Sequence, residues 1–249
     1  MWENITSDKC ESYIERHFGQ KGKRLSGEPS KPAITISRAE GAGGLTVSSQ
    51  LASYLRTKVP SHEEWTIFDQ KLVTKVLEVF NLKTRVGEFM KEDHKGTISD
   101  AIEEFIGLHP NTWTLVERTN ATILRLAQIG NCILVGRGAN MVTRDLPNVF
   151  HARLVGSFER RVERAREVFG YDLKTATNYI KKKDQGRKRY LKDNFDADID
   201  DALLYDIVIN TDRVRYEEAA RLIGDEVIRR FDLATPAKVA MSTVSQAVF

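Results

Sequence analysis

Cysteines, long apolar runs and excess charge are all scarce in this sequence, and each absence excludes a class of protein. The two cysteines, Cys10 and Cys132, lie far apart, so a disulfide framework is not expected and a reducing cytoplasm fits better. No stretch approaches the ~18 apolar residues of a membrane-spanning helix. The first residues include acids and lack an apolar core, so they do not form a secretion signal. We therefore expect a cytoplasmic protein with no membrane partner.

The charge balance points away from a nucleic-acid partner. The 38 basic and 35 acidic residues give a formal net charge of +3, so any functional basic surface has to be local. Hydrophobic residues make up 41% of the chain, which is enough for a full core. The length of 249 residues fits one α/β domain with extensions or two small domains. The sequence carries no readable signal for oligomeric state.

The chain is organised around a strand, a glycine-rich loop and a helix. Residues 33–38 begin with a short apolar, β-branched run that is typical of a buried strand. Three glycines then fall within four positions, and Val47, Leu51 and Leu55 follow at the spacing of a helix. This order is typical of a phosphate-binding loop, in which backbone N–H groups and a helix N-terminus face an anion. The alternative is a strand-to-helix turn that binds nothing.

The loop lacks the lysine of the usual pattern G-x-x-x-x-G-K-[ST]. Gly43 matches the second glycine, while Arg38 stands at the first glycine and Gly44 stands at the lysine. Leu45 then separates Gly44 from the hydroxyl of Thr46, as in the G-A-G-K-G-T loop of nucleoside monophosphate kinases. The loop therefore keeps the spacing of that motif without its cation.

Two further strands end in residues suited to a ligand. Asp69 follows a short strand, where it serves an acceptor, caps the next helix, or does both. The apolar run 131–135 predicts a central parallel strand, and it ends in a Gly-Arg-Gly turn centred on Arg137. The glycines allow the guanidinium, a planar fork suited to phosphate, to project from the sheet. The alternative is a solvated arginine in a tight turn.

The densest charge lies in residues 181–192, which hold seven basic residues and one acid. Three interpretations stay open: a solvated helix face, a segment that closes over a triphosphate, and a nucleic-acid surface. Upstream, a helix that begins after Ser157 carries Arg160 and Arg164 on one face. We expect most arginines of that helix to be surface charges paired with neighbouring glutamates.

In their order, these landmarks resemble the cytidylate kinase-like family, within the nucleoside monophosphate kinase group of P-loop proteins. The resemblance covers residues 33–231 and rests on the first strand and loop, Phe68-Asp69, residues 135–138, part of the basic segment, and residues 205–210. It implies a P-loop NTPase fold, a three-layer α/β/α domain with a five-stranded parallel sheet and a helical lid. The expected organisation is an N-terminal helix and linker at 1–32, the kinase-like domain at 33–231 with its lid near 171–200, and a loose tail at 232–249.

The resemblance also implies roles for individual residues. Arg137 would hold the acceptor monophosphate, Asp69 would be the acid near the acceptor, and Asp184 and Arg187 would act at the transferring phosphoryl group. The residues expected to bind ATP are Gly41, Ala42, Gly43, Gly44, Leu45 and Thr46. The hydroxyl of Thr46 is also the candidate ligand for Mg²⁺. The other lid residues are Lys183, Lys188, Arg189 and Tyr190, and Lys188 or Arg189 would replace Arg187 if the register slips.

Two departures from the family pattern bear on activity. Gly44 replaces the loop lysine, and Gly138 replaces an acid that follows the Gly-Arg pair. The branch of the family that begins with Ser-Arg commonly lacks the lysine as well. We expect Arg38, counted here among the catalytic residues, or a cation from the lid to take over the electrostatic role of the lysine.

The function that we expect is phosphoryl transfer from ATP, with Mg²⁺, to a nucleoside monophosphate, with CMP as the first candidate. Three alternatives remain. The first is a degenerate kinase fold that binds a nucleotide as a sensor or scaffold. The second is a kinase of another small phosphorylated metabolite. The third is an RNA-binding protein, which the modest net charge and the lack of an aromatic–basic platform disfavour.

Overall fold

The computed structural model describes residues 31–59, 64–69, 112–136 and 138–234. Within these residues the chain forms one sheet of five parallel strands in the order β2-β3-β1-β4-β5. The strands are β1 (Ala33–Arg38), β2 (Thr66–Phe68), β3 (Cys132–Val135), β4 (Val149–Val155) and β5 (Ile207–Asn210). This topology confirms the five-stranded parallel sheet that the sequence predicts.

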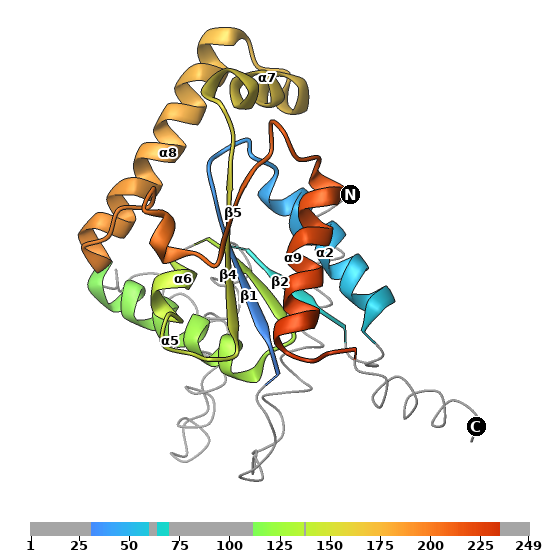
Figure 1. The fold of residues 1–249 in the computed structure, drawn as a ribbon. Helices are drawn as coiled ribbons and strands as arrows, with labels where there is room; N and C mark the ends of the chain where they lie inside the picture. Colours follow the sequence, from blue (N-terminus) through green and yellow to red (C-terminus); the bar gives the residue numbers. More distant parts are fainter. Residues whose placement is uncertain (1–30, 60–63, 70–111, 137, 235–249) are drawn as a thin grey trace, which may run out of the picture.

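Helices cover both faces of the sheet and complete three layers (Figure 1). One face is covered by α2 (Gly44–Lys58) and α9 (Tyr216–Arg230), which pack against each other. The other face is covered by α5 (Thr112–Ile129) and the short α6 (Ala139–Val142). The remaining helices are α7 (Phe158–Phe169), α8 (Leu173–Phe195) and the 3₁₀ turn η1 (Ala202–Leu204).

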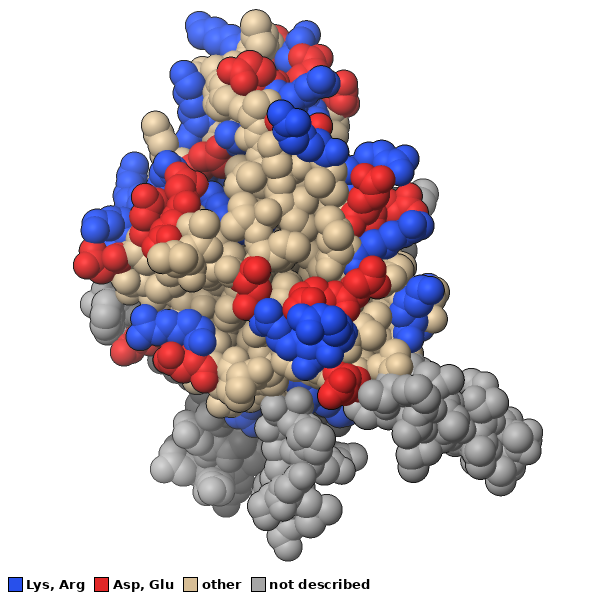
Figure 2. Space-filling view, viewed as in Figure 1, with Lys and Arg blue, Asp and Glu red and all other residues tan. Residues whose placement is uncertain are grey.

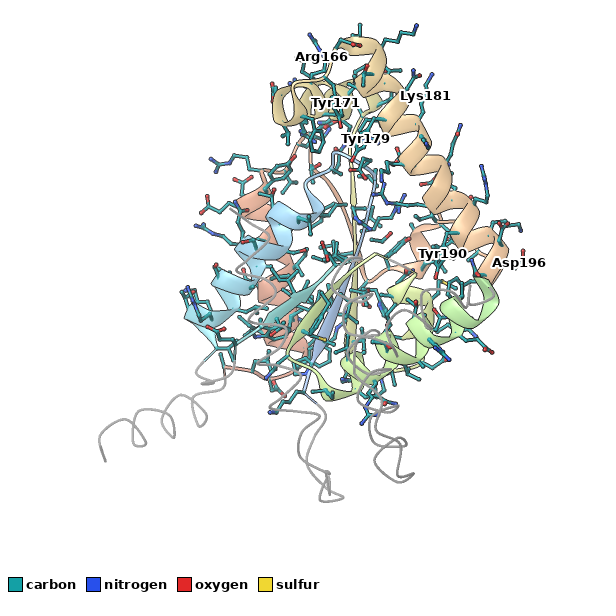
Figure 3. The ribbon with its side chains drawn as sticks, turned by 180° about the vertical axis from the view of Figure 1, so that it is seen from behind. Arg166, Tyr171, Tyr179, Lys181, Tyr190 and Asp196 are labelled. Atoms are coloured by element: carbon teal, nitrogen blue, oxygen red, sulfur yellow. The ribbon has the colours of Figure 1, made fainter. Side chains whose placement is uncertain are left out.

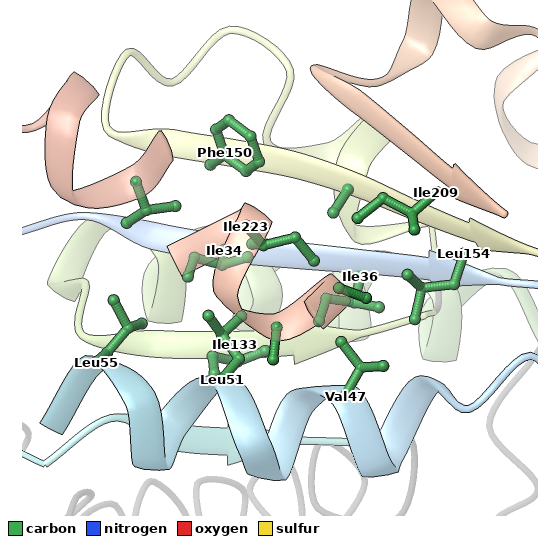
Figure 4. Packing of buried hydrophobic residues seen from close by; sticks show 14 of the residues in the cluster. Ile34, Ile36, Val47, Leu51, Leu55, Ile133, Phe150, Leu154, Ile209 and Ile223 are labelled. Carbon is green, nitrogen blue, oxygen red and sulfur yellow. The ribbon is translucent and has the colours of Figure 1, made fainter. Parts of the chain in front are cut away.

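The core explains why β3, whose sequence is Cys-Ile-Leu-Val, is apolar on both sides. Successive side chains of a strand point to opposite faces, so a strand covered on both faces favours apolar residues at every position. Ile34 of β1 packs with Leu51 of α2 and Ile223 of α9 in one fully buried cluster (Figure 4). On the opposite face, Leu134 of β3 packs with Leu126 of α5.

The α7–α8 hairpin stands over the carboxyl end of the sheet, and α8 then runs back down beside the domain toward α6 (Figure 1). The whole basic segment 181–192 lies inside α8, which we call the lid helix. Asp172 starts this helix by accepting a hydrogen bond from the backbone N–H of Thr175 at 2.8 Å. The lid helix therefore extends from the α7–α8 turn above the sheet to the neighbourhood of α6.

The apolar residues within 202–211 predict a single last strand, but residues 202–204 form η1, because the Asp201 carboxylate accepts a hydrogen bond from the N–H of Leu203. The apolar spacing within 70–111 predicts helices, but this segment lies outside the described residues, as do the N-terminal segment 1–30 and Arg137. Within the described ranges, no helix is long and apolar enough to cross a membrane.

Candidate active site

The loop between β1 and α2 lies at the carboxyl end of the sheet and requires glycine at two positions. Gly41 and Gly43 have φ angles of 78° and 83°, which glycine adopts without strain. A Cβ at Gly41 would lie 2.9 Å from the carbonyl oxygen of Arg161, and one at Gly43 would overlap the ring of Tyr216. Gly43 is also the N-cap of α2 and has no side chain to cap it, so this helix end is suited to an anion.

The first turn of α2 presents the remaining residues expected to bind ATP. Ala42 and Gly44 are buried, whereas Leu45 and Thr46 are exposed. Thr46 is therefore accessible from solvent beside the loop. Among the described residues no group of three or more His, Cys, Asp or Glu side chains could hold a metal by itself. A metal here would need phosphate oxygens as well.

Five residues join the loop to the α7–α8 hairpin, and we call them the loop–lid cluster: Glu40, Arg161, Tyr179, Asp184 and Arg187. The backbone N–H of Glu40 donates to Asp184 Oδ1 at 2.8 Å. The Glu40 carboxylate accepts hydrogen bonds from Arg187 and from the Tyr179 hydroxyl, the latter at 3.1 Å. Arg187 also lies 3.5 Å from Asp184 Oδ1. The lid helix is thus attached directly to the glycine-rich loop between β1 and α2.

The charges of the cluster are balanced within it. Burial alone would raise the pKa of Glu40, but the charge and hydrogen bond of Arg187, with the charge of Arg38, hold that pKa below its usual value. Burial, together with the Glu40 charge, raises the pKa of Tyr179 to about 12. Glu40 is therefore ionised and Tyr179 neutral at neutral pH. A phosphate that binds at the loop would therefore lie near a Glu40 carboxylate whose charge is already balanced by Arg187.

Two arginines of α7 contact the loop, whereas we expected most arginines of this helix to be surface charges, as Arg166 is in its pair with Glu163. Arg161 is buried and donates to the carbonyls of Gly156 and Glu40 and, at 2.5 Å, to Asp184 Oδ2. Arg164 donates to the carbonyl of Thr211 at 2.9 Å and lies 5.4 Å from the ring centroid of Tyr216. The buried Val162 and Ala165 mark the inward face of α7, and that pattern was the available signal for Arg161.

The other lid residues point in different directions along α8. Lys183 lies 5.7 Å from the Tyr179 ring, and Lys188 pairs with Asp200 at 2.5 Å. Asp200 also pairs at 2.6 Å with Arg153, a buried residue of β4. Arg189 is exposed. Arg187, Lys188 and Arg189 were the candidates for the lid residue that reaches the transferring phosphoryl group. Of these, Arg187 belongs to the loop–lid cluster, whereas Lys188 pairs with Asp200.

The lower half of the lid helix packs on the turn that follows β3. A Cβ at Gly138 would lie 2.7 Å from Phe195 Cε2 and 3.4 Å from Tyr190 Cε1, and these two rings pack edge to face. Figure 3 places Tyr179 near the upper end of α8 and Tyr190 near its lower end. The aromatic rings occupy the space that an acidic side chain at Gly138 would need. An acidic side chain at position 138 would therefore require these rings to shift.

The candidate acceptor side of the site lies at the ends of β2 and β3. Gly136, with φ of 84°, ends β3, and its N–H donates to the Ile36 carbonyl of β1 at 3.0 Å. The turn therefore lies directly beside the end of β1. Asp69 follows β2, the strand next to β3 in the sheet. The structure thus brings the glycine-rich loop, the Gly136 turn and Asp69 to one edge of the sheet.

Arg38 ends β1 and lies between the loop and the Gly136 turn. A Cβ at Gly44 would lie 2.9 Å from Arg38 Cγ and 3.2 Å from Arg38 Cδ. A Cβ at Gly136 would overlap Arg38 Nη1 and lie 3.0 Å from Cζ. The stem of Arg38 thus runs along the start of α2, and its guanidinium reaches the turn after β3.

Comparisons with known proteins agree with this geometry. A curated relative from Thermoplasma acidophilum, called cytidylate kinase, is 24% identical over 209 residues, covering 82% of this chain and 97% of that protein. A second relative of the same name, from Methanococcus aeolicus, is 25% identical over 157 residues, covering 62% of this chain and 88% of that protein. A crystal structure of an uncharacterized protein from Eubacterium ventriosum shares the fold, with a TM-score of 0.58, 24% identity and coverage of 79% and 98% of the two chains.

The family assignment rests on the sequence model together with the fold. The model of the cytidylate kinase-like family matches residues 33–213, which include all five strands, the loop and the lid helix. This family relationship supports a phosphotransferase of the kinase type. The chain belongs to the cytidylate kinase-like family.

Proposed function

We propose that this protein transfers the γ-phosphoryl group of ATP to a nucleoside monophosphate, with CMP as the first acceptor to test. The observation that carries the proposal is the course of the lid helix. Its Asp184 and Arg187 contact the donor loop at Glu40, and its Tyr190 lies at the Gly138 turn. A helix that touches both sides can enclose two phosphorylated substrates between them.

The chemistry requires no covalent intermediate, so positioning and charge neutralisation are the main contributions of the protein. The loop N–H groups and the start of α2 would hold the ATP phosphates, and Arg187 would stabilise charge on the transferring group. The Thr46 hydroxyl would be the protein ligand to Mg²⁺, which would supply positive charge to neutralise the ATP phosphates. Arg137 would hold the acceptor phosphate and Asp69 would lie near the acceptor. We expect Lys183 and Arg189 to add positive charge around the closed site.

Nucleotide binding would have to exchange partners within the loop–lid cluster. Asp184 accepts the N–H of Glu40 at 2.8 Å, a donor that a phosphate oxygen would use in a phosphate-binding loop. Arg187 is shared by Glu40 and Asp184. An ATP phosphate would replace these carboxylates at the same donors. The cluster therefore keeps the phosphate-binding groups in place before the nucleotide arrives.

A buried side-chain amide beside the turn that follows β3 supports a phosphoryl acceptor whose base can accept a hydrogen bond. Asn140 follows the turn in α6 and is buried, and its Nδ2 has no hydrogen-bond partner within the described part of the chain. A buried donor without a partner costs about 1–3 kcal/mol, so a ligand oxygen or ring nitrogen would gain by accepting from it. We propose that Asn140 contacts the acceptor base.

Replacing Asn140 by Ala is expected to raise the KM for the acceptor about tenfold while leaving the melting temperature within a few degrees of wild type. The reason is that the amide gains a partner only when the acceptor is bound. Steady-state kinetics over a series of acceptor concentrations and thermal denaturation give the two values. An unchanged KM for the acceptor would remove Asn140 from the site.

Phosphoryl transfer from ATP with Mg²⁺ to CMP, dCMP, UMP, AMP and GMP is the direct test of the proposed function. We expect transfer to one of these acceptors and a loss of at least about 100-fold in kcat/KM in Arg137→Ala, because a bidentate arginine–phosphate contact is lost. Arg221→Ala, which removes an exposed arginine of α9, is the control for the change of charge. Transfer that is equal in wild type and Arg137→Ala would contradict the role of Arg137.

The second candidate function is a nucleotide-binding kinase fold without turnover. Gly44 in place of the loop lysine favours it, as does the engagement of the Glu40 N–H by Asp184. ATP binding by calorimetry without transfer to any acceptor in the panel would support this candidate or a kinase of another phosphorylated metabolite. An RNA-binding role gains little support, because positive and negative side chains are intermingled over the face shown in Figure 2.

A further inference from the structure

The loop lysine is not simply missing, because another side chain occupies its place. A Cβ on residue 44 would lie 2.9 Å from Cγ and 3.2 Å from Cδ of Arg38. Carbon atoms that are not bonded to each other rest at about 3.5–4.0 Å, so these separations are repulsive. Gly44 is buried in the first turn of α2. A side chain at position 44 therefore competes for space with the stem of Arg38.

The guanidinium of Arg38 fills the space that a Cβ would need at a second glycine, Gly136. A Cβ at Gly136 would overlap Nη1 of Arg38 and lie 3.0 Å from its Cζ. The turn at Gly136 is held beside β1, since its N–H donates to the Ile36 carbonyl at 3.0 Å. Its φ of 84° also favours glycine. Two glycines, on different elements, thus leave room for the stem and the head of one arginine.

We propose that Arg38 supplies the positive charge that the lysine supplies in other phosphate-binding loops, and that Gly44 and Gly136 are the packing requirement of this exchange. The positive charge is thus carried by the last residue of β1 and not by a residue in the first turn of α2. Its guanidinium lies between the glycine-rich loop, which would bind the ATP phosphates, and the turn after β3, which would bind the acceptor phosphate. A phosphoryl group in transfer would be found between these two segments. This inference rests on the proposed function, because it assigns a role within the same site.

The electrostatics of the loop agree with this placement. The charge of Arg38 contributes to the lowered pKa of Glu40, so it acts at the loop and is not remote from it. Arg187 balances the same carboxylate from the lid side. Two guanidinium groups would therefore flank the ATP phosphates, one from the sheet and one from the lid. A planar fork at Arg38 can contact two phosphate oxygens at once, which a lysine cannot do.

The charge of Arg38 is tested with Arg38→Gln, which keeps most of the stem along Gly44 and removes the charge. We expect the Kd for Mg·ATP, measured by calorimetry, to rise about 10- to 100-fold with little change in melting temperature. Arg221→Ala serves as the matched control, since it loses one exposed arginine of α9 that pairs with Glu217. An arginine that only packs between the two elements would leave the ATP affinity of Arg38→Gln unchanged.

The exchange itself is tested with Gly44→Lys, Arg38→Ala and the double variant Arg38→Ala/Gly44→Lys. We expect Gly44→Lys alone to lose stability and ATP affinity, because both side chains need the same space. The double variant should recover ATP affinity to within about tenfold of wild type, because a lysine at the usual position then has room. A double variant that folds but binds ATP no better than Arg38→Ala would overturn the exchange.

The outcomes separate this inference from the proposed function. If wild type transfers phosphoryl groups and Arg38→Gln binds Mg·ATP with unchanged affinity, the inference is wrong and the proposed function stands. If wild type does not bind Mg·ATP at all, both are wrong. If the double variant fails to fold, Arg38→Gln still decides the role of the charge.

Discussion

Replacing Arg161 by Met is expected to lower the melting temperature by about 10 °C, from a loss of about 3 kcal/mol in the free energy of unfolding. The substitution keeps much of the buried volume and removes three hydrogen bonds, to Gly156 O, Glu40 O and Asp184 Oδ2. The Asp184 carboxylate, whose side chain is 23% exposed, then loses its 2.5 Å partner. Breaking a mostly buried pair leaves the Asp184 charge compensated only by Arg187 at 3.5 Å and by the Glu40 N–H, and such a loss costs more than the pair itself contributed.

The matched control is Arg166→Met on the same helix. Arg166 pairs with Glu163 at 3.0 Å, but the two side chains are 42% and 54% exposed. Such a surface pair contributes about 0–1 kcal/mol, so the melting temperature should stay within a few degrees of wild type. Equal shifts in the two variants, measured by thermal and urea denaturation, would mean that Arg161 does not hold the loop to the hairpin. Arg161→Met/Asp184→Asn should recover part of the loss, since the stranded charge is gone.

Replacing Arg187 by Met is expected to lower kcat at least about 1,000-fold, as for other arginines that stabilise a phosphoryl group in transfer. The fold should remain, since the side chain of Arg187 is partly solvated and Arg161 still holds Asp184. The variant also leaves the Glu40 carboxylate beside the ATP phosphates without its arginine. Repulsion should therefore raise the KM for ATP as well as lower kcat.

The double variant Arg187→Met/Glu40→Gln separates these two effects. Removing the Glu40 charge should restore the KM for ATP toward the wild-type value without restoring kcat, because the charge that stabilises the transition state is still missing. Lys192→Met is the control, since Lys192 is an exposed cation of α8 that pairs with Asp196. A kcat for Arg187→Met within tenfold of wild type would exclude Arg187 as the lid arginine, and steady-state kinetics decide this.

The sequence by itself determined the local elements and most of the fold. β1, the loop, α2, β3 and α9 follow from short-range patterns: apolar runs for buried strands, glycines at the turn, and a four-residue apolar spacing for the helices. These features depend on neighbours within a few residues, so no tertiary information is needed to find them. The order of strands and glycine turns was enough to indicate the family that the model of residues 33–213 identifies.

The tertiary structure alone decided which charges meet at the site. Glu40 and Asp184 are 144 positions apart, and Glu40 and Arg187 are 147 apart, so no local pattern joins them. The phase of α7 against the loop selects Arg161 for burial, and the phase of α8 directs Arg187, but not Lys188, to the loop.

The absent lysine illustrates the same division. The sequence showed only that Gly44 stands where a lysine is usual and that Arg38 precedes the loop. Whether that arginine fills the space depends on how the end of β1 packs against the first turn of α2 and the turn after β3, and these contacts exist only once the sheet has formed. Residue types and spacing set the candidates for the site, whereas side-chain packing between distant segments selected among them.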